Sequence, residues 1–294
     1  MKAFAICTLA YLVALAAAIA CGLALRQSHP IAVAAAADFV ATLVVFGFSR
    51  ATNNSSIYDP YWSVAPLAIL AYYALGPWAL GENPLRVLVT SAVVTAWGAR
   101  LTFNWARRWK GLADEDFRYV DLREKHGPRY WVVSFLGIHL FPTVLVFLGC
   151  LPLYYAVTSR EPLGALDVLG VAVAVLGIWF ETTADRQLRH FAQSARGRGA
   201  ILATGLWRYS RHPNYFGEIT FWWGLLAIGL GASSGAWWTA VGALSITALF
   251  KLASVPLIDA RMLARRPAYA EHMRTTNAIF PWPPQAERRV RAPR

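Results

Sequence analysis

The run AFAICTLAYLVALAAAIACGLAL, residues 3–25, contains no charged side chain. It is longer than the roughly 18 apolar residues that mark a candidate transmembrane helix. Lys2 precedes it, as a basic residue precedes the apolar part of a secretion signal. The run is too long for such a signal, and another apolar run follows almost at once, so we expect a retained membrane helix.

The composition extends this interpretation to the whole chain of 294 residues, of which 57% are apolar and only 15% charged. Soluble domains carry charges on about a quarter of their residues. The net charge of +12 does not indicate a nucleic-acid partner, because the basic residues lie in short loops between apolar runs. The three cysteines lie inside apolar runs and form neither a disulfide framework nor a metal pattern.

The apolar runs predict an all-α polytopic membrane bundle in one domain. The expected spans cover residues 3–25, 31–48, 63–80, 85–104, 130–157, 163–180, 216–230 and 236–258. The third and seventh are short, so the prediction is seven to eight transmembrane helices. Prolines 142 and 152 are expected to kink the fifth span. The sixth helix is expected to continue beyond the membrane through Arg189.

Arg and Lys gather in residues 104–130, in residues 184–215 with Arg196 and Arg198, and in the tail. Positive loops stay in the cytoplasm, so we expect these segments and both chain ends on that side. The polar loop at residues 53–62 falls on the same side in this topology. The motif-like segments would then share one face of the membrane.

The most distinctive polar segment is GLWRYSRHPNYFGE, residues 205–218, which runs directly into an apolar span. A carboxylate there costs several kcal/mol unless it is paired, so Glu218 should have a partner, with Arg208, Arg211 and His212 as the nearest candidates. Asn214 and Glu218 are four residues apart and share a helical face. Arg211 and His212 precede the expected helix start, which favours an anion site. The alternative is a basic cluster that binds lipid head groups.

Each of three further segments has two interpretations, one as part of a functional site and one as ordinary structure. The acidic and basic residues at 181, 185, 186 and 189 line either a site or a solvated helix end. In the loop NNSSIYD, residues 53–59, Tyr58 or Asp59 would give a substrate a proton or a hydrogen bond, or the loop is simply polar. Trp97, Arg100, Asn104 and Arg108 follow helical spacing, so they face a cavity, or the arginines reach toward the membrane surface.

Six of these segments together resemble the steroid 5-alpha-reductase family, especially its bacterial members. They are NSSIYDPYW (54–62), WGARLTFN (97–104), EDFRY (115–119), ETTADRQ (181–187), WRYSRHPNYFGE (207–218) and RRPAY (265–269). The resemblance covers roughly residues 50 to 282. It implies an integral membrane enzyme, in the bacterial inner membrane, that uses NADPH to reduce the carbon–carbon double bond of an enone lipid, typically a 3-oxo-4-ene steroid.

The resemblance also implies roles for individual residues. The helices in residues 1–157 would enclose the substrate, and residues 163–282 would hold the cofactor. The cofactor-binding set is Glu181, Asp185, Arg186, Arg189, Arg208, Tyr209, Arg211, His212, Asn214, Tyr215, Glu218 and Asp259, with Arg108 from the earlier half. The catalytic set is Tyr58 and Asp59, where the family has a Gln-Glu pair, and Trp97, where eukaryotic members have a catalytic tyrosine.

The Arg-His-Pro-x-Tyr-x-Gly pattern also resembles sterol C14 and C24 reductases and membrane methyltransferases that use S-adenosylmethionine. Those methyltransferases usually carry paired glutamates in the tail, whereas this chain has Asp259 alone in the corresponding segment 257–261. This difference favours a reductase. A lipid-binding membrane protein without catalytic activity is the third class, and it predicts neither a bound cofactor nor turnover.

Overall fold

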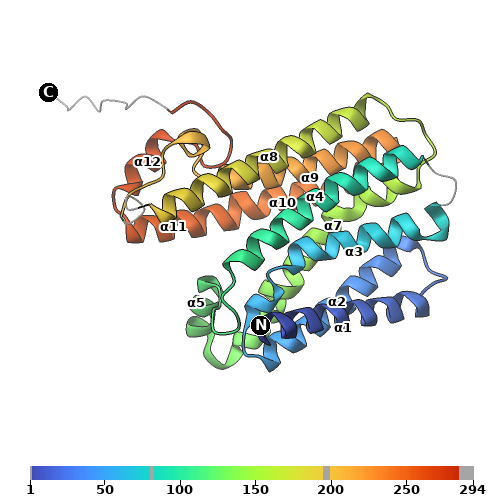
Figure 1. Cartoon of the computed structure of the whole chain (residues 1–294), viewed down its shortest axis with the longest axis horizontal. Helices are drawn as coiled ribbons and strands as arrows, with labels where there is room; N and C mark the ends of the chain where they lie inside the picture. Colours follow the sequence, from blue (N-terminus) through green and yellow to red (C-terminus); the bar gives the residue numbers. More distant parts are fainter. Residues whose placement is uncertain (1, 80–82, 195–198, 285–294) are drawn as a thin grey trace. The chain divides into compact units, whose positions relative to one another are not determined.

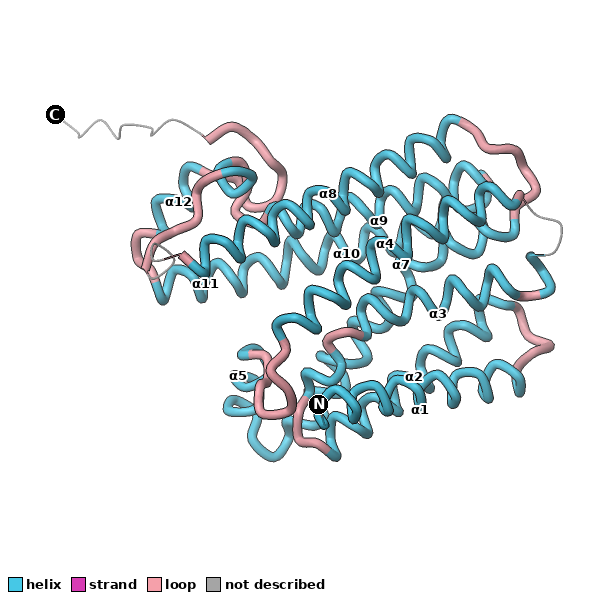
Figure 2. Tube along the Cα trace, in the orientation of Figure 1, coloured by secondary structure: helices cyan, strands magenta, loops and turns pink. Residues whose placement is uncertain are grey.

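The computed structural model describes residues 2–79, 83–194 and 199–284 (Figure 1). Every regular element in these residues is a helix, as the apolar runs predict, and short loops join the helices (Figure 2). Residues 80–82, at the end of the expected third span, and the basic residues Arg196 and Arg198 lie outside the described residues. The all-α fold class is therefore confirmed.

Five helical segments among the described residues are long and apolar enough to cross a membrane. They are α1 (Lys2–Ala24), α2 (Pro30–Ala51), the segment Phe117–Thr158, α8 (Ala165–Gln193) and the segment Ser234–Arg265. The other three expected spans are also helices, namely α3 (Tyr61–Leu75), α4 (Pro84–Arg108) and α9 (Pro213–Ala232). Helix α3 has only 15 residues, and α4 and α9 carry charged side chains within their length. A count of seven to eight spans stays a prediction.

The chain forms two compact units. The first contains Met1–Val168 and Leu225–Gly242, and the second contains Leu169–Gly224 and Ala243–Arg294. The residues 225–242 of the first unit comprise the C-terminal part of α9, the turn that follows and the start of the next helix. The assignment of residues 1–157 to the substrate and of residues 163–282 to the cofactor stays a prediction.

In the first unit, α1 packs along α2, and α3 packs against α4 and α7 (Phe141–Thr158). Helices α3 and α4 approach closely at Gly98, where an added Cβ would lie 2.8 Å from the Ser63 carbonyl oxygen. A π-helical stretch, Ser134–Leu140, precedes α7, and Pro142 lies in the first turn of α7. The predicted disturbance near Pro142 is therefore a local change of helix type.

In the second unit, α8 and α9 touch through glycines. A Cβ on Gly217 would lie 2.6 Å from Cγ of Glu181 and 2.7 Å from the Gly177 carbonyl oxygen. Helix α10 (Ala240–Leu249), a π-helical turn (Phe250–Ser254) and α11 (Val255–Arg265) form the last long helical segment. The short helix α12 (Tyr269–Thr275) follows. The close α8–α9 contact places Glu181 next to the segment that carries Asn214 and Glu218.

Candidate functional site

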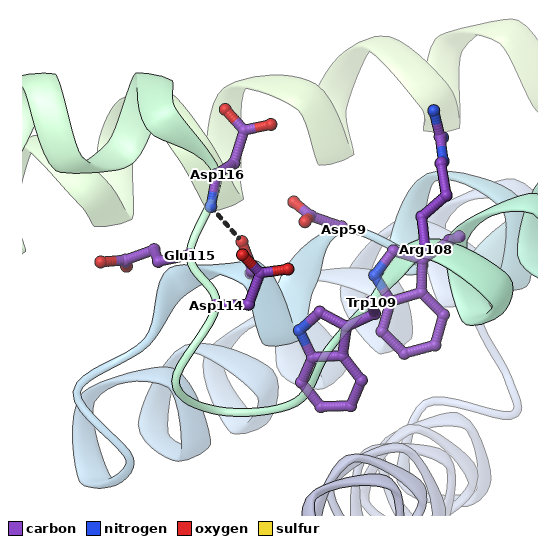
Figure 3. A pocket seen from close by; sticks show the side chains of 8 residues that line it. Asp59, Arg108, Trp109, Asp114, Glu115 and Asp116 are labelled. Carbon is purple, nitrogen blue, oxygen red and sulfur yellow. Dashed lines mark hydrogen bonds between the residues drawn. The ribbon is translucent and has the colours of Figure 1, made fainter. Parts of the chain in front are cut away.

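A pocket of about 210 Å³ opens in the first unit (Figure 3). Three segments form it: the 3-10 turn η1 (Ser55–Tyr58) with the residue that follows, the end of α4, and the loop before α5 (Phe117–His126). The backbone N–H of Asp116 donates a hydrogen bond of 2.9 Å to Ser56 Oγ, which ties the loop to η1. The lining residues are Ser56, Asp59, Trp105, Arg108, Trp109, Asp114, Glu115 and Asp116.

Asp59 is the acidic residue of the pocket whose pKa differs most from that of an exposed aspartate. Burial raises the pKa of the Asp59 carboxyl to about 7, although the hydrogen bond from Tyr119 lowers it. Tyr119 Oη donates to Asp59 Oδ1 at 2.8 Å. A large part of the Asp59 population therefore carries a proton at neutral pH, and a carboxylic acid can donate both a hydrogen bond and a proton.

Tyr58, the neighbouring predicted acid, has its hydroxyl proton engaged elsewhere. Thr42 Oγ1 donates to the Asp38 carbonyl oxygen at 2.9 Å, and it lies 2.9 Å from Thr143 Oγ1. Because Thr42 has one proton, Thr143 must donate to Thr42, and the Tyr58 hydroxyl, 2.8 Å from Thr143, must donate to Thr143. Tyr58 is thus left as an acceptor toward any further group.

Of the other predicted residues in this unit, the pocket includes Arg108 but not Trp97. Arg108 lines the pocket, its Nε donates to the Asn104 carbonyl oxygen at 3.1 Å, and its guanidinium extends away from Trp109 (Figure 3). Trp97 is fully buried in α4 and does not line the pocket. The structure therefore brings Asp59 and Arg108 together and places Tyr58 and Trp97 in the helix packing.

Two of the acidic residues at the pocket are neutralised by arginines. Glu115 is paired with Arg123 at 3.0 Å and accepts the Ser55 backbone N–H at 2.7 Å. Asp116 is paired with Arg118 at 2.8 Å. These pairs reduce the negative charge that a ligand would meet in the pocket.

A second polar cluster lies in the second unit and is centred on Asp259 of α11. Its carboxylate binds Arg211 Nη2 at 2.7 Å, His212 Nε2 at 2.9 Å and Tyr269 Oη at 2.7 Å. Arg211 also donates to the carbonyl oxygens of Thr276 at 2.5 Å and Met273 at 3.3 Å. These contacts fasten the segment before α9 to α11 and to the chain after α12.

The cluster gives Arg211 and His212 a structural role, although both were predicted to bind phosphate or to pair with Glu218. Arg211 is 9% exposed, and its guanidinium is directed to Asp259 and to carbonyl oxygens. Glu218 accepts a hydrogen bond of 2.9 Å from the Trp222 indole one turn further along α9. Asp259 was predicted to contact the cofactor; in the structure it holds protein groups, and a cofactor contact stays a prediction.

Asn214 lies one turn before Glu218 on α9, as their spacing predicts. Its side-chain oxygen is buried and has no hydrogen-bond partner among the described residues. Glu218 is 4% exposed, and Glu181 of α8, which packs on Gly217 between them, is equally buried. Three polar groups thus gather where α8 and α9 touch.

The remaining predicted cofactor residues surround this α8–α9 contact. Arg186, Arg208 and Tyr209 are exposed, and Asp185 and Arg189 are half-buried on α8. Tyr215 stacks on His212 with ring centroids 5.2 Å apart. Gln187 Oε1 accepts the Leu206 backbone N–H at 3.0 Å, and the Ala184 carbonyl oxygen accepts the Trp207 indole N–H at 3.1 Å. These bonds join the end of α8 to the segment before α9.

Sequence reasoning assigned no role to four residues that shape these clusters. Tyr119 and Tyr269 each donate to an aspartate, and both lie in motifs that carry the family resemblance. Trp105, in the last turn of α4, and Trp109, its C-cap residue, line the pocket and are four residues apart. Their helical spacing was the available signal, because it continues the pattern of Trp97 and Arg108.

Comparison with known proteins gives two findings. The model of a family described as a protein of unknown function, DUF1295, matches residues 45–276. An uncharacterized protein of Schizosaccharomyces pombe is 26% identical over 282 residues, which cover 87% of this chain and 80% of that protein. No solved structure matches the chain.

Proposed function

The chain belongs to the DUF1295 family, which includes steroid 5-alpha-reductase-like proteins, and from this premise we propose that it is a membrane reductase. Its substrate would be an enone lipid such as a 3-oxo-4-ene steroid, and its reductant would be NADPH. One observation carries the proposal: the Asn214 side-chain oxygen is buried without a partner among the described residues. A buried unpaired acceptor costs about 1–3 kcal/mol, which a ligand that donates to it would recover.

The residues around Asn214 fit a nicotinamide cofactor. A carboxamide N–H is the kind of donor that the Asn214 oxygen requires, and the buried Glu218 on the same helix face offers a second acceptor. Arg186 and Arg208 are exposed on the neighbouring segments, where guanidinium groups would bind phosphates. Arg211 contributes by fixing the start of α9, because Asp259 and two carbonyl oxygens hold it.

The bound cofactor would supply a hydride to the β-carbon of the enone. The protein's own part is to position the reactants and to manage charge. Asn214 and Glu218 would orient the nicotinamide ring. As the β-carbon gains the hydride, the π electrons of the double bond move toward the ketone oxygen, and a fixed donor stabilises that charge. The protonated Asp59 is the preferred acid for the resulting enolate, because the Tyr58 proton is engaged with Thr143.

The direct test uses purified protein in detergent with NADPH and 4-cholesten-3-one, a 3-oxo-4-ene steroid. We expect consumption of reduced nicotinamide and a product heavier by two hydrogens, with deuterium at the β-carbon when the transferred hydride is labelled. S-adenosylmethionine in place of NADPH is the control for the methyltransferase alternative. Methyl transfer without any NADPH oxidation across a set of enone lipids would show that the proposal is wrong.

Asn214→Ala should weaken NADPH binding without harming the fold. Losing one hydrogen bond to a buried amide costs about 1–3 kcal/mol, so we expect the NADPH dissociation constant to rise roughly 5- to 150-fold by calorimetry. The melting temperature without NADPH should stay level or rise, since the substitution removes an unpaired polar atom. Thr182→Ala, at an exposed position of α8, is the matched control and should leave both values unchanged.

An Asn214→Ala variant that loses thermal stability but keeps its NADPH affinity would show that Asn214 stabilises the fold and does not bind the cofactor. The same result would remove the observation on which the cofactor assignment depends. Binding is measured in the absence of steroid, so that the outcome does not depend on the identity of the substrate.

We expect Asp59 to make kcat fall on the alkaline side of the pH profile. Because the pKa of Asp59 is raised to about 7, its acid form is lost above neutral pH, and we expect kcat to fall about tenfold per pH unit beyond that point. Asp59→Asn should lower kcat by about 10²–10⁴-fold and abolish this fall. Tyr58→Phe should keep the fall at the same pH.

The same pKa predicts an effect on stability. Between about pH 4 and pH 7 the folded protein retains a proton on Asp59 that the unfolded chain releases. The contribution of Asp59 to the free energy of unfolding therefore falls as the pH rises through this interval. Melting temperatures of wild type and Asp59→Asn measured across it should diverge; parallel curves would contradict a raised pKa.

A further inference from the structure

Two tryptophans form one wall of the pocket in the first unit. Trp105 lies in the last turn of α4 and Trp109 is its C-cap residue, and their indole rings stack with centroids 4.9 Å apart and planes 25° apart. Both indole nitrogens are buried, and neither has a hydrogen-bond partner among the described residues. Trp109 is 8% exposed, and it faces the pocket together with Asp59 (Figure 3).

Unpaired buried donors are rare in native proteins, and each costs about 1–3 kcal/mol. Five other tryptophans, Trp78, Trp207, Trp222, Trp223 and Trp238, donate from their indole nitrogens to oxygen acceptors. Trp105 and Trp109 thus combine a packing role with two donors that have no acceptor among the described residues.

The rings are held firmly. Phe4 of α1 packs edge-on against both indoles, with centroid distances of 5.9 Å to Trp105 and 5.0 Å to Trp109. A donor fixed in this way loses little entropy when an acceptor arrives, which is the condition for effective stabilisation of developing charge.

The remaining pocket residues indicate what the acceptor is. Arg108 is the basic residue of the lining, and Glu115 and Asp116 are already paired with Arg123 and Arg118. Asp114 adds a carboxylate whose Oδ2 accepts the Lys110 backbone N–H at 3.4 Å. Two indole N–H donors and the Asp59 carboxyl suit an oxygen atom that becomes more negative, and the carbonyl oxygen of an enone has this property.

We propose that the indole N–H groups of Trp105 and Trp109 bind the carbonyl oxygen of the enone lipid in this pocket and stabilise the charge that develops there. The inference rests on the proposed function and extends it to two residues that the sequence did not single out. It gives the pocket the role of an oxyanion hole built from side chains of one helix.

The test uses 4-cholesten-3-one labelled with carbon-13 at the carbonyl, whose stretching frequency is read by infrared difference spectroscopy on the full-length protein. Hydrogen bonds lower this frequency, so we expect a shift on binding that is reduced in Trp109→Phe and in Trp105→Phe and is lost in the double variant. Turnover should fall about 10²- to 10³-fold for each donor removed. Trp237→Phe, at an indole 71% exposed, is the matched control.

Phenylalanine keeps an aromatic ring against Phe4, and it removes a donor that has no partner among the described residues. Because phenylalanine also leaves part of the indole volume empty in this core cluster, we expect a modest fall in melting temperature with the fold retained. A variant that unfolds would show that the indoles serve packing, and this result would overturn the inference.

The remaining outcomes separate this inference from the proposed function. A carbonyl shift that disappears in the phenylalanine variants supports the binding of the carbonyl oxygen by the two indoles. If NADPH is not oxidised in the same experiment, only the reductase proposal is wrong. If the variants oxidise NADPH at the wild-type rate and keep the carbonyl shift, the proposed role of the two indoles is wrong. The reductase proposal is then unaffected. Failure of the steroid to bind wild type, or binding with no carbonyl shift, would overturn the inference.

Discussion

Arg86→Met is expected to lower the melting temperature of the purified protein by on the order of 10 °C. Arg86 begins α4, is 1% exposed and binds Asp167 twice, through Nε at 2.7 Å and Nη2 at 3.0 Å. It also donates to the carbonyl oxygens of Glu161 at 2.8 Å and Pro162 at 2.9 Å. Methionine fills the space but leaves a buried carboxylate and two carbonyl oxygens without these donors, at a cost of about 3–5 kcal/mol.

The double variant Arg86→Met, Asp167→Leu is the informative control. It removes both charges, so most of the lost stability should return, because an apolar pair of similar volume often replaces a buried ion pair without penalty. Melting in detergent, followed by intrinsic fluorescence, measures both variants. A single variant that melts within about a degree of wild type would mean that the pair contributes no stability.

The helices were predictable from the length of the apolar runs. The predicted limits of the first span, residues 3–25, agree within one residue with α1, because nothing but Lys2 and Arg26 interrupts the run. The third span was predicted to continue to residue 80, but α3 ends at Leu75. Gly76 adopts an extended conformation before Pro77, and a residue before proline is disfavoured in a helix.

Tertiary pairing was not predictable, because sequence spacing gives no information about partners on other helices. Arg86 and Asp167 are 81 residues apart, and each alone resembles an ordinary charge at a helix end. Helix α5 was missed inside a charged segment, although Asp116 signalled its start by accepting the Arg118 backbone N–H at 2.9 Å. The π-helical stretches before α7 and α11 have no recognised sequence signature here.

The candidate sites show the same limit. The four-residue spacing of Asn214 and Glu218 was sufficient to place both on one face of α9. It could not show that Arg211, three residues before Asn214, would bind a carboxylate 48 residues further along the chain. A run of basic residues predicts an electrostatic role, but only the folded chain decides whether the partner is a phosphate or another side chain.

Asp259→Ala is expected to destabilise the second unit by about 3–5 kcal/mol, because it leaves the Arg211 guanidinium buried without its counter-charge. It also removes the acceptor shared by His212 and Tyr269. Burial and the neighbouring carboxylate raise the pKa of Tyr269, so its phenol stays protonated and needs that acceptor. The melting temperature and the hydrogen-exchange protection of residues 269–276 should both fall in the absence of NADPH.

Asp259→Asn sharpens this test, because it keeps the shape and removes the charge. Its amide offers one oxygen to three donors, so we expect an intermediate loss of stability. Glu271→Gln is the control, since Glu271 lies on α12 with an exposed ion pair to Arg274, and exposed pairs contribute about 0–1 kcal/mol. If both Asp259 variants were as stable as wild type without NADPH but bound it less tightly, Asp259 would belong to the cofactor site. If both lose stability without ligand, Arg211 and His212 act by building the start of α9, and the exposed arginines remain the candidates for binding the phosphates of the proposed cofactor.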